Sequence, residues 1–289
     1  MTGVPARVGV LGGGRMGAGI AHAFLLAGAE VVVLERDEAA ASAALTAVRQ
    51  HLERSAERGA VESADEVLPR ARATSAVADL AGCGLVVEAV FEDLEVKAEV
   101  LGRVEAVLMP DAWLATNTSS ISVDALARRI RRGDRLCGLH FFNPVPASAL
   151  VEIVRGPRTP PELVDAARGW VEALGKTAVV VADAPGFASS RLGVAIALEA
   201  MRMLEEGVAS PEDIDTAMRL GYRHPMGPLE LTDLVGLDVR LGIAEYLAGE
   251  LGERFAPPAI LREKVRAGRL GRKTGEGFYT WPRWGGRHG

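Results

Sequence analysis

The chain has 289 residues, of which 48% are apolar and 25% are charged. These values are typical of a globular protein of one or two domains and exclude disordered, collagen-like and coiled-coil chains. The net charge of −5, without a block of like charges, argues against a nucleic-acid or membrane partner. Two cysteines, Cys83 and Cys137, are too few for a disulfide framework or a cysteine-rich zinc site. We therefore expect no metal site and a reducing compartment, the cytoplasm. No apolar run approaches the roughly 20 residues that a membrane helix needs.

The N-terminal segment predicts a strand, a glycine-rich turn, a helix and a second strand. Arg7–Leu11 is a short apolar run typical of a buried strand, and Gly12-Gly13-Gly14-Arg15-Met16-Gly17 follows it at once. Helical periodicity over Ala18–Ala27 and a second apolar run over Glu30–Leu34 come next, and Glu35 closes the segment. This is the pattern of the dinucleotide-binding βαβ unit, in which Gly-x-Gly-x-x-Gly joins strand to helix.

Each part of this pattern has a physical role in binding a dinucleotide. Gly12 permits the tight turn, Gly14 lets the pyrophosphate approach the backbone, and Gly17 lets the helix pack closely on the strand. The helix N-terminus offers free N–H groups and the positive end of its dipole to the pyrophosphate. Glu35 is expected to accept hydrogen bonds from the ribose hydroxyls and to repel a 2′-phosphate, which favours NAD over NADP; Arg36 is interpreted as a solvated loop charge. The alternative is a glycine-rich turn in an α/β protein that binds no nucleotide.

The middle of the chain alternates short apolar runs with helical patterns, which predicts further parallel strands of a doubly wound sheet. Ala39–Glu57 is helical in period and Ser63–Ala71 continues that character. This helical insertion, residues 39–71, exceeds a minimal crossover and is expected to contact substrate. The predicted parallel strands are Leu85–Ala89, Trp113–Thr116 and Leu136–Phe141, separated by helical patterns such as Leu94–Leu108 and Val123–Ile130, with later strands at Leu150–Val154 and Ala178–Val181.

At Asp183–Phe187 the sequence pattern changes from alternating strands and helices to helices alone. From Arg191 onward the chain is almost wholly helical in pattern, with helix starts at Ser210 and near Pro228. The glycine-rich tail Gly271–Tyr279 predicts an ordered loop. The expected fold class is therefore α/β: a Rossmann-type doubly wound sheet in residues 1–184, followed by an all-α C-terminal domain in residues 185–289.

Two ionisable residues in predicted strands indicate acid–base chemistry. His140 ends its strand, where doubly wound sheets bind ligands, and Asn117-Thr118-Ser119-Ser120 follows another strand. Glu152 lies between apolar residues, and a buried carboxylate needs a partner, for which His140 on a neighbouring strand is available. A carboxylate on one imidazole nitrogen fixes the tautomer and raises basicity at the other, which suits removal of a hydroxyl proton while hydride leaves for nicotinamide. The alternative is a core histidine and an acid that faces solvent on an edge strand. These residues indicate a nicotinamide-dependent oxidoreductase and leave its substrate open.

Motifs along nearly the whole chain resemble, in order, those of the 3-hydroxyacyl-CoA dehydrogenase family, which includes the 3-hydroxybutyryl-CoA dehydrogenases. The matching segments are Gly12–Ala21, Val87-Glu88-Ala89, Asn117-Thr118-Ser119-Ser120, Gly138–Pro146, Leu150-Val151-Glu152, Pro185-Gly186-Phe187, Pro225-Met226-Gly227-Pro228 and Lys273–Tyr279. The resemblance implies an enzyme of fatty acid metabolism that uses NAD, with a helical domain that forms a homodimer interface.

The resemblance also implies roles for individual residues. His140 corresponds to the family's catalytic base, Glu152 to the acid that orients it, and Ser119 to a residue near the reacting hydroxyl. The cofactor-binding residues expected from the motif and the resemblance together are Gly12, Gly14, Arg15, Met16, Gly17, Glu35, Glu92, Lys97, Asn117, Ser119, Asn143 and Lys273. The expected substrate-binding residues are Ser119, Asn143, Ser190 and Arg58.

Departures from the family pattern gather on the substrate side. Ser190 stands where the family has an active-site Asn, and a hydroxyl has one donor where a carboxamide has two. Ser148-Ala149-Leu150 replaces Met-Lys-Leu and loses a positive charge. In the helical insertion, the family's Ser and Lys align with His51 and Arg58, and its second basic residue is Ala60. We therefore expect a CoA thioester with a short or unusual acyl group.

Three alternatives to this function remain. The first is a dehydrogenase for a hydroxyacyl group on an acyl carrier protein, as in polyketide extender-unit pathways. The second is a free β-hydroxyacid dehydrogenase, although Arg191–Glu206 lacks the catalytic Lys of that group. The third is a non-catalytic NAD-binding protein, against which the presence of both His140 and Glu152 argues.

Overall fold

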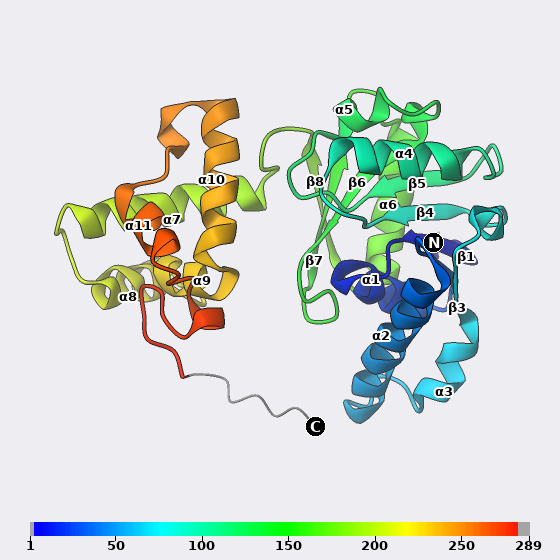
Figure 1. Ribbon diagram of the computed structural model, residues 1–289, viewed down its shortest axis with the longest axis horizontal. Coiled ribbons are helices and arrows are strands. Elements are labelled where there is room, and N and C mark those ends of the chain that lie inside the picture. Colours follow the sequence, from blue (N-terminus) through cyan, green and yellow to red (C-terminus); the bar gives the residue numbers. More distant parts are fainter. Residues whose placement is uncertain (1–2, 283–289) are drawn as a thin grey trace. The chain divides into compact units, whose positions relative to one another are not determined.

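The computed structural model describes residues 3–282 and divides after Phe187 into two compact units, each described here by itself (Figure 1). The first unit is an α/β domain and the second is helical. The predicted fold class is confirmed.

The first unit is built on an eight-stranded sheet with the order β3-β2-β1-β4-β5-β6-β7-β8. Strands β3 to β6 are parallel, β7 is antiparallel to β6, and β8 is parallel to β7. The chain order reverses between β1 and β4, which is where a doubly wound sheet binds its ligand. The strands are β1 (Arg7–Leu11), β2 (Glu30–Leu34), β3 (Ala71–Thr74), β4 (Leu85–Glu88), β5 (Trp113–Thr116), β6 (Leu136–Phe141), β7 (Leu150–Arg155) and β8 (Thr177–Ala182).

Helices cover both faces of this sheet, as expected of a parallel sheet whose strands are apolar on both sides. One core packs α1, α2 and α6 on the sheet, and the other packs α4, α5 and the short helix η2. Side chains cap several helices at their N-termini: Asp37 accepts from the Ala40 N–H and Asp93 from those of Glu95 and Val96. The helices are α1 (Arg15–Leu26), α2 (Glu38–Glu57), α3 (Ala64–Val67), α4 (Leu94–Glu105), α5 (Val123–Ala127) and α6 (Pro161–Ala173), with 3₁₀ turns η1 (Leu68–Arg70), η2 (Val77–Leu80) and η3 (Gly133–Arg135).

Two features of the sheet differ from the sequence prediction. The helical pattern expected to run to Ala71 ends earlier, because Ala71–Thr74 is strand β3, paired in parallel with β2. The reversal at β7 was also not predicted. It places His140 directly opposite Glu152 in the register of β6 and β7, so the two side chains lie on the same face of the sheet.

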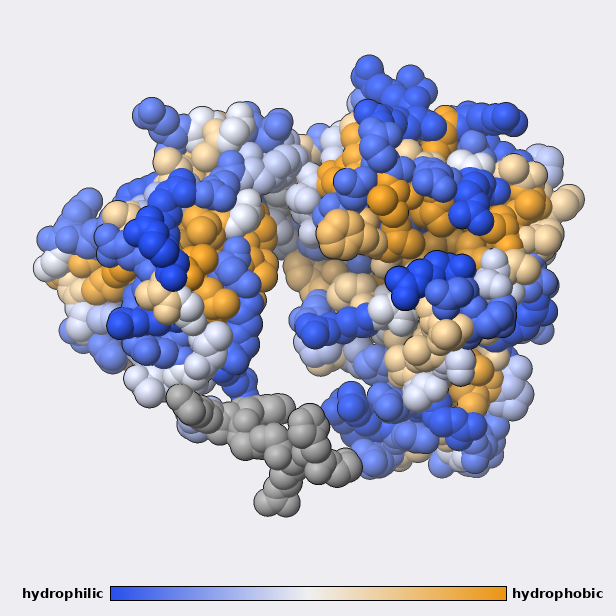
Figure 2. Space-filling view, in the orientation of Figure 1, coloured by the Kyte–Doolittle hydropathy of each residue, from blue (hydrophilic) through white to orange (hydrophobic). Residues whose placement is uncertain are grey.

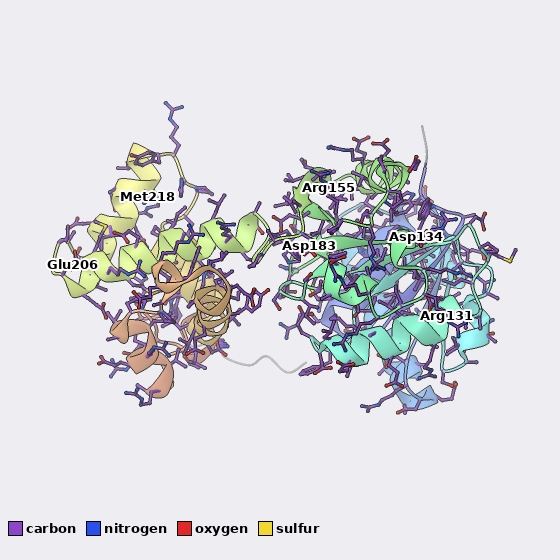
Figure 3. The ribbon with its side chains drawn as sticks, turned by 90° about the horizontal axis from the view of Figure 1, so that it is seen from above. Arg131, Asp134, Arg155, Asp183, Glu206 and Met218 are labelled. Carbon is purple, nitrogen blue, oxygen red and sulfur yellow. The ribbon has the colours of Figure 1, made fainter. Side chains whose placement is uncertain are left out.

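The far edge of the sheet is tied to α5 through Asp183, which follows β8 and is labelled in Figure 3 together with Arg155 at the end of β7. The Asp183 carboxylate accepts hydrogen bonds from the Ser122 hydroxyl at 2.7 Å and from the Asp124 N–H at 2.8 Å. These two hydrogen bonds hold the N-terminus of α5, which follows the turn after β5, to the end of β8.

The second unit packs five helices around an apolar core of its own in the part of the chain that the structure describes. Buried aspartates hold its glycine-rich tail: Asp233 accepts from the N–H groups of Phe278 and Tyr279, and Asp215 from the Tyr279 hydroxyl. The tail is therefore ordered, as predicted. The helices are α7 (Ser189–Glu205), α8 (Pro211–Gly221), α9 (Pro228–Val235), α10 (Leu237–Leu251) and α11 (Ala259–Arg266), with 3₁₀ turns η4 (Glu253–Phe255) and η5 (Arg272–Thr274).

Within residues 3–282, none of the helices has the length and apolar character needed to cross a membrane. Cys83 and Cys137 are both buried free thiols, and burial raises the pKa of Cys83 to about 11 and of Cys137 to about 12. Neither thiol is therefore a reactive thiolate near neutral pH.

Candidate active site

The glycine-rich turn between β1 and α1 has the geometry that a pyrophosphate site needs. Gly12 has a φ of +88°, in the region that favours glycine, and a Cβ on Gly17 would lie 1.7 Å from the Gly12 carbonyl oxygen. Gly14 is the N-cap of α1, and among the described residues no side chain caps this helix end. Its free N–H groups and positive dipole end are thus available to an anion, so the residues present fit NAD.

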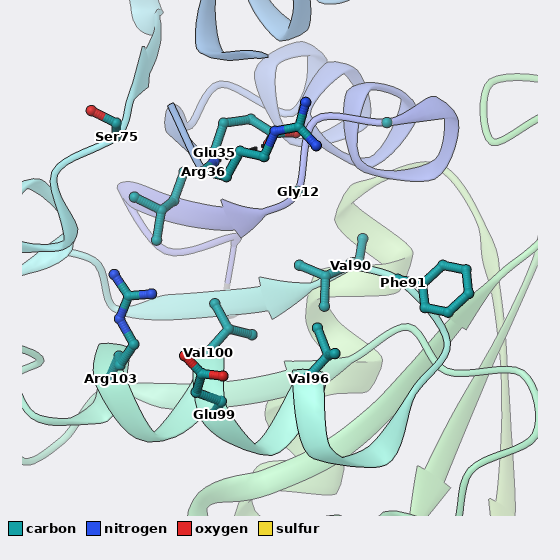
Figure 4. A pocket seen from close by; sticks show the side chains of 13 residues that line it. Gly12, Glu35, Arg36, Ser75, Val90, Phe91, Val96, Glu99, Val100 and Arg103 are labelled. Atoms are coloured by element: carbon teal, nitrogen blue, oxygen red, sulfur yellow. Dashed lines mark hydrogen bonds between the residues drawn. The ribbon is translucent and has the colours of Figure 1, made fainter. Parts of the chain in front are cut away.

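A pocket of 560 Å³ begins at this turn and runs along the carboxyl ends of the neighbouring strands. Figure 4 shows Glu35 and Arg36 on one side of it and the side chains of α4 on the other. Figure 2 shows apolar surface gathered over α4 and β4 of this unit. An apolar pocket with a few polar groups is typical of a small-ligand site. The residues of the pocket are Gly12, Gly14, Leu34, Glu35, Arg36, Ser75, Ala89, Val90, Phe91, Val96, Glu99, Val100 and Arg103.

Glu35 directly follows β2, and its side chain connects this strand to the glycine turn. Its carboxylate accepts a hydrogen bond from the Gly13 N–H at 2.7 Å and one from the Arg36 N–H at 3.1 Å. The Arg36 side chain is 84% exposed and ion-paired with Asp37 at 3.0 Å. The negative charge at this point of the pocket therefore belongs to Glu35, while the charge of Arg36 is in solvent and matched by Asp37.

His140 and Glu152 form a buried pair on the opposed strands β6 and β7. The Nδ1 atom of His140 lies 2.8 Å from Oε2 of Glu152, and the two residues are 6% and 1% exposed. The ring centroids of Phe142 and Phe187 lie 4.5 and 5.6 Å from the centroid of the imidazole, so both rings lie beside it. With Nδ1–H donating to the carboxylate, Nε2 is the acceptor nitrogen.

A second pocket, of 340 Å³, contains His140 and shares Ala89 and Val90 with the first. It brings together half of the predicted site residues of the first unit: Met16, Glu92, Lys97, Asn117, Ser119, His140 and Asn143. Asn117 also fixes the end of β6, since its side-chain oxygen accepts from the Phe141 N–H at 2.9 Å. Residues from the ends of three strands, β4, β5 and β6, therefore converge with Met16 of α1 and Lys97 of α4 in one pocket.

A buried charged network supports this pocket. Lys97 of α4 is 1% exposed and forms ion pairs with Glu88 at 2.7 Å and Glu92 at 3.1 Å. Burial raises the pKa of Glu88 although Lys97 opposes the shift. Burial would also raise the pKa of Glu92, but Lys97 and the Thr118 hydroxyl outweigh it and lower that pKa. Glu92 is thus held as a carboxylate at neutral pH.

Three predicted site residues lie elsewhere. Arg58 caps the far end of α2, is exposed, and lines neither of these pockets. Ser190 lies in the first turn of α7 and Lys273 in η5, both in the second unit. The Nζ of Lys273 binds both carboxylate oxygens of Asp238 at 2.6 Å.

Sequence reasoning gave no role to Glu88, Thr116 or Thr118, which are fully or almost fully buried beside the pocket. The sequence did indicate that Glu88 could be buried. Like Glu152, it is an acid next to a run of apolar residues in a predicted strand. A carboxylate in such a position needs buried partners, and here Lys97 and Thr116 provide them.

A glycine turn at a free helix N-terminus, beside a histidine held by a buried carboxylate, defines a dinucleotide-dependent oxidoreductase of the Rossmann type. Comparison with known proteins makes the class specific. Residues 7–184 match the model of the 3-hydroxyacyl-CoA dehydrogenase NAD-binding domain, and residues 186–281 match that of the 3-hydroxyacyl-CoA dehydrogenase C-terminal domain.

Relatives align over nearly the full length of the chain. A probable 3-hydroxybutyryl-CoA dehydrogenase of Deinococcus radiodurans is 41% identical over 95% of this chain and 100% of its own. A 3-hydroxybutyryl-CoA dehydrogenase of Mycobacterium tuberculosis is 43% identical over 95% of this chain and 98% of its own. The crystal structure of the (S)-3-hydroxybutyryl-CoA dehydrogenase of Ralstonia eutropha superposes with a TM-score of 0.90 at 38% identity, covering 96% of this chain and 99% of that one.

The chain belongs to the 3-hydroxyacyl-CoA dehydrogenase family. It is an NAD-dependent oxidoreductase, which confirms the predicted resemblance, enzyme class and cofactor.

Proposed function

We propose that this enzyme interconverts a 3-hydroxyacyl thioester and its 3-oxoacyl form, with CoA as the carrier. The observation that carries the proposal is the 2.8 Å contact between His140 Nδ1 and Glu152 Oε2, in a pocket that adjoins the glycine turn. The relatives support the substrate class, because they are named 3-hydroxybutyryl-CoA dehydrogenases.

The proposed mechanism assigns the proton to His140. Its Nε2 accepts the proton of the substrate 3-hydroxyl during oxidation and returns it during reduction, while Glu152 fixes the tautomer and stabilises the imidazolium. Bound NAD supplies the hydride acceptor. Ser119 and Asn143 orient the substrate hydroxyl, and Glu35, together with the N–H groups of the glycine turn, holds the adenosine ribose and the pyrophosphate.

The carrier of the acyl group is part of the proposal. CoA carries several phosphate charges, and Ala149 and Ala60 stand where the family pattern has basic residues. Arg58, exposed at the end of α2, is the proposed phosphate contact in their place. The second candidate, an acyl carrier protein, presents a phosphopantetheine arm with a single phosphate and would be less affected by the missing charges.

A homodimer is proposed from the surface of the second unit. Large apolar side chains are exposed on three helices of this unit, and exposed apolar surface is typical of protein interfaces. The exposed residues on α7, α9 and α10 are Leu192, Ile196, Leu231, Leu234, Val235 and Val239. Sedimentation at several concentrations, comparing wild type with Leu192→Asp, tests the dimer.

The cytoplasm is the proposed compartment of the enzyme. Cys83 and Cys137 are buried free thiols, and free thiols are typical of a reducing compartment.

The substrate class is tested by following NADH oxidation with three forms of one 3-oxoacyl group: the CoA thioester, the carrier-protein thioester and the free acid. We expect the CoA thioester to have the highest kcat/KM. A carrier thioester that is preferred by tenfold or more would replace CoA with the second candidate. Turnover of the free acid alone would overturn the proposed thioester function.

A further inference from the structure

A chain of charged contacts runs from the end of β4 to the turn that carries Ser119. Glu88 is 0% exposed and accepts from Lys97 Nζ at 2.7 Å, from the Val90 N–H at 2.7 Å and from the Thr116 hydroxyl at 2.6 Å. An uncompensated buried carboxylate is strongly destabilising, so this group is kept in place by all three donors. Glu88 is not among the residues that line either pocket.

Lys97 is ion-paired with both Glu88 and Glu92 and so connects the two carboxylates. Its ammonium contacts Glu88, Glu92 at 3.1 Å and the Val90 carbonyl oxygen at 3.3 Å. A lysine ammonium has three N–H donors, and these three acceptors use all of them. Lys97 therefore links Glu88 to Glu92 in the wall of the pocket.

The Glu92 carboxylate is hydrogen-bonded to residues 118–120, the turn after β5. One carboxylate oxygen accepts from the Thr118 hydroxyl at 2.5 Å and from the N–H groups of Ser119 and Ser120 at 3.0 and 3.1 Å. The other oxygen meets Lys97. The orientation of Glu92, and with it the position of Ser119 in the His140 pocket, thus depends on where Lys97 is held.

We propose that Glu88 is a positioning residue for the reaction: by anchoring Lys97 it sets Glu92, and thereby the Thr118–Ser120 turn that presents Ser119 to the substrate. This inference rests on the proposed function, since it gives Ser119 a place in that reaction. Misplacement of a substrate-orienting group by about 1 Å can lower the rate about 100-fold.

The first test is Glu88→Gln, assayed with acetoacetyl-CoA and NADH. Gln keeps the size of the side chain and an acceptor for Thr116, but removes the charge that anchors Lys97. We expect kcat to fall about 10- to 100-fold, with a smaller loss of NADH affinity, because Lys97, Glu92 and Ser119 shift while the glycine turn stays in place.

The matched control is Glu105→Gln. Glu105 is also a buried carboxylate of the first unit, 5% exposed, and it also clamps a loop, accepting from the N–H groups of Arg131 (labelled in Figure 3) and Arg132 at 2.9 Å. Its partners follow α5 and are not pocket residues. We expect this variant to lose thermal stability and to keep the wild-type kcat.

The double variant Glu88→Gln/Lys97→Met separates positioning from stability. Both buried charges are removed together, so we expect thermal stability to recover relative to Glu88→Gln while kcat stays low, because Glu92 has lost the contact that orients it. Recovery of the wild-type kcat in the double variant would overturn the proposal, as would a Glu88→Gln kcat within twofold of an active wild type. Neither result affects the proposed function, whereas a wild-type enzyme that turns over no 3-oxoacyl thioester overturns both.

Discussion

Replacing Glu152 with Gln removes the charge that faces the catalytic imidazole and keeps the shape of the side chain. The carboxylate and the ring are almost fully buried, with 2.8 Å between Oε2 and Nδ1. Their charge centres are then roughly 4 Å apart, and at an effective dielectric constant of about 20 the carboxylate stabilises an imidazolium by about 4 kcal/mol. Part of this is recovered by the hydrogen bond that Gln can still accept.

We therefore expect Glu152→Gln to lower kcat by about 10²–10³, since each ~1.4 kcal/mol of lost transition-state stabilisation is a factor of ten. The assay is the initial rate of NADH oxidation with saturating acetoacetyl-CoA, together with NADH binding by fluorescence. Glu172→Gln, an exposed acid on α6 of the same unit, is the control and should keep the wild-type kcat. If Glu152→Gln turns over within a few-fold of wild type, the carboxylate does not support the base and this reasoning is refuted.

Three further predictions concern the cofactor and the stability of the two units. Wild type should prefer NADH to NADPH, and Glu35→Ser should narrow the ratio of their kcat/KM values about tenfold or more, because the carboxylate that follows β2 beside the glycine turn is removed. Equal use of NADPH by wild type would mean that Arg36 governs the pocket. Burial lowers the pKa of His22 to about 4, against about 6.5 in the unfolded chain, so the unfolded state binds its proton first and stability falls as the pH drops from 6.5 to 4. The loss should be about 2–3 kcal/mol in urea unfolding, and a pH dependence unchanged in His22→Gln would contradict it. Arg240→Met should raise the free energy of unfolding by about 1–3 kcal/mol, because Arg240 is 7% exposed and its buried Nε has no hydrogen-bond partner in the described chain. An unchanged or lower Tm would contradict this prediction.

The cofactor half of the fold could be predicted because its signals are local. The spacing of Gly12, Gly14 and Gly17 is set by one turn, and Glu35 closes the following strand. Strand β3 was missed because Ala71–Thr74 is only four residues long and alternates alanine with polar residues, so it contains no apolar run. Its pairing with β2, a tertiary contact, decides its structure.

The antiparallel direction of β7 could have been inferred from the number of residues that connect it to β6. Only residues 142–149 connect β6 to β7, and a crossover between parallel strands needs a dozen residues or more. An antiparallel pair therefore follows from the short connection, whereas the register that sets His140 opposite Glu152 is seen only in the structure. The distances within the pair and the burial of both groups could come only from the structure.

The network behind Ser119 shows what sequence patterns leave out. The residues Glu88, Lys97 and Thr116 come from β4, α4 and β5, and their contacts depend on how these elements pack. A single sequence marks each residue as polar in apolar surroundings but does not say which of them meet. For the same reason, Ser190, Arg58 and Lys273 keep their substrate and cofactor roles as predictions.

The most direct measurement is the rate of NADH oxidation by wild type and by His140→Gln with acetoacetyl-CoA, each at saturating NADH. We predict that wild type turns over the thioester and that the variant loses about 10²–10⁴ in kcat, the usual range for general acid–base catalysis, with its Kd for NADH unchanged. A His140→Gln enzyme that keeps kcat within a few-fold of wild type would contradict the assignment of His140 as the base.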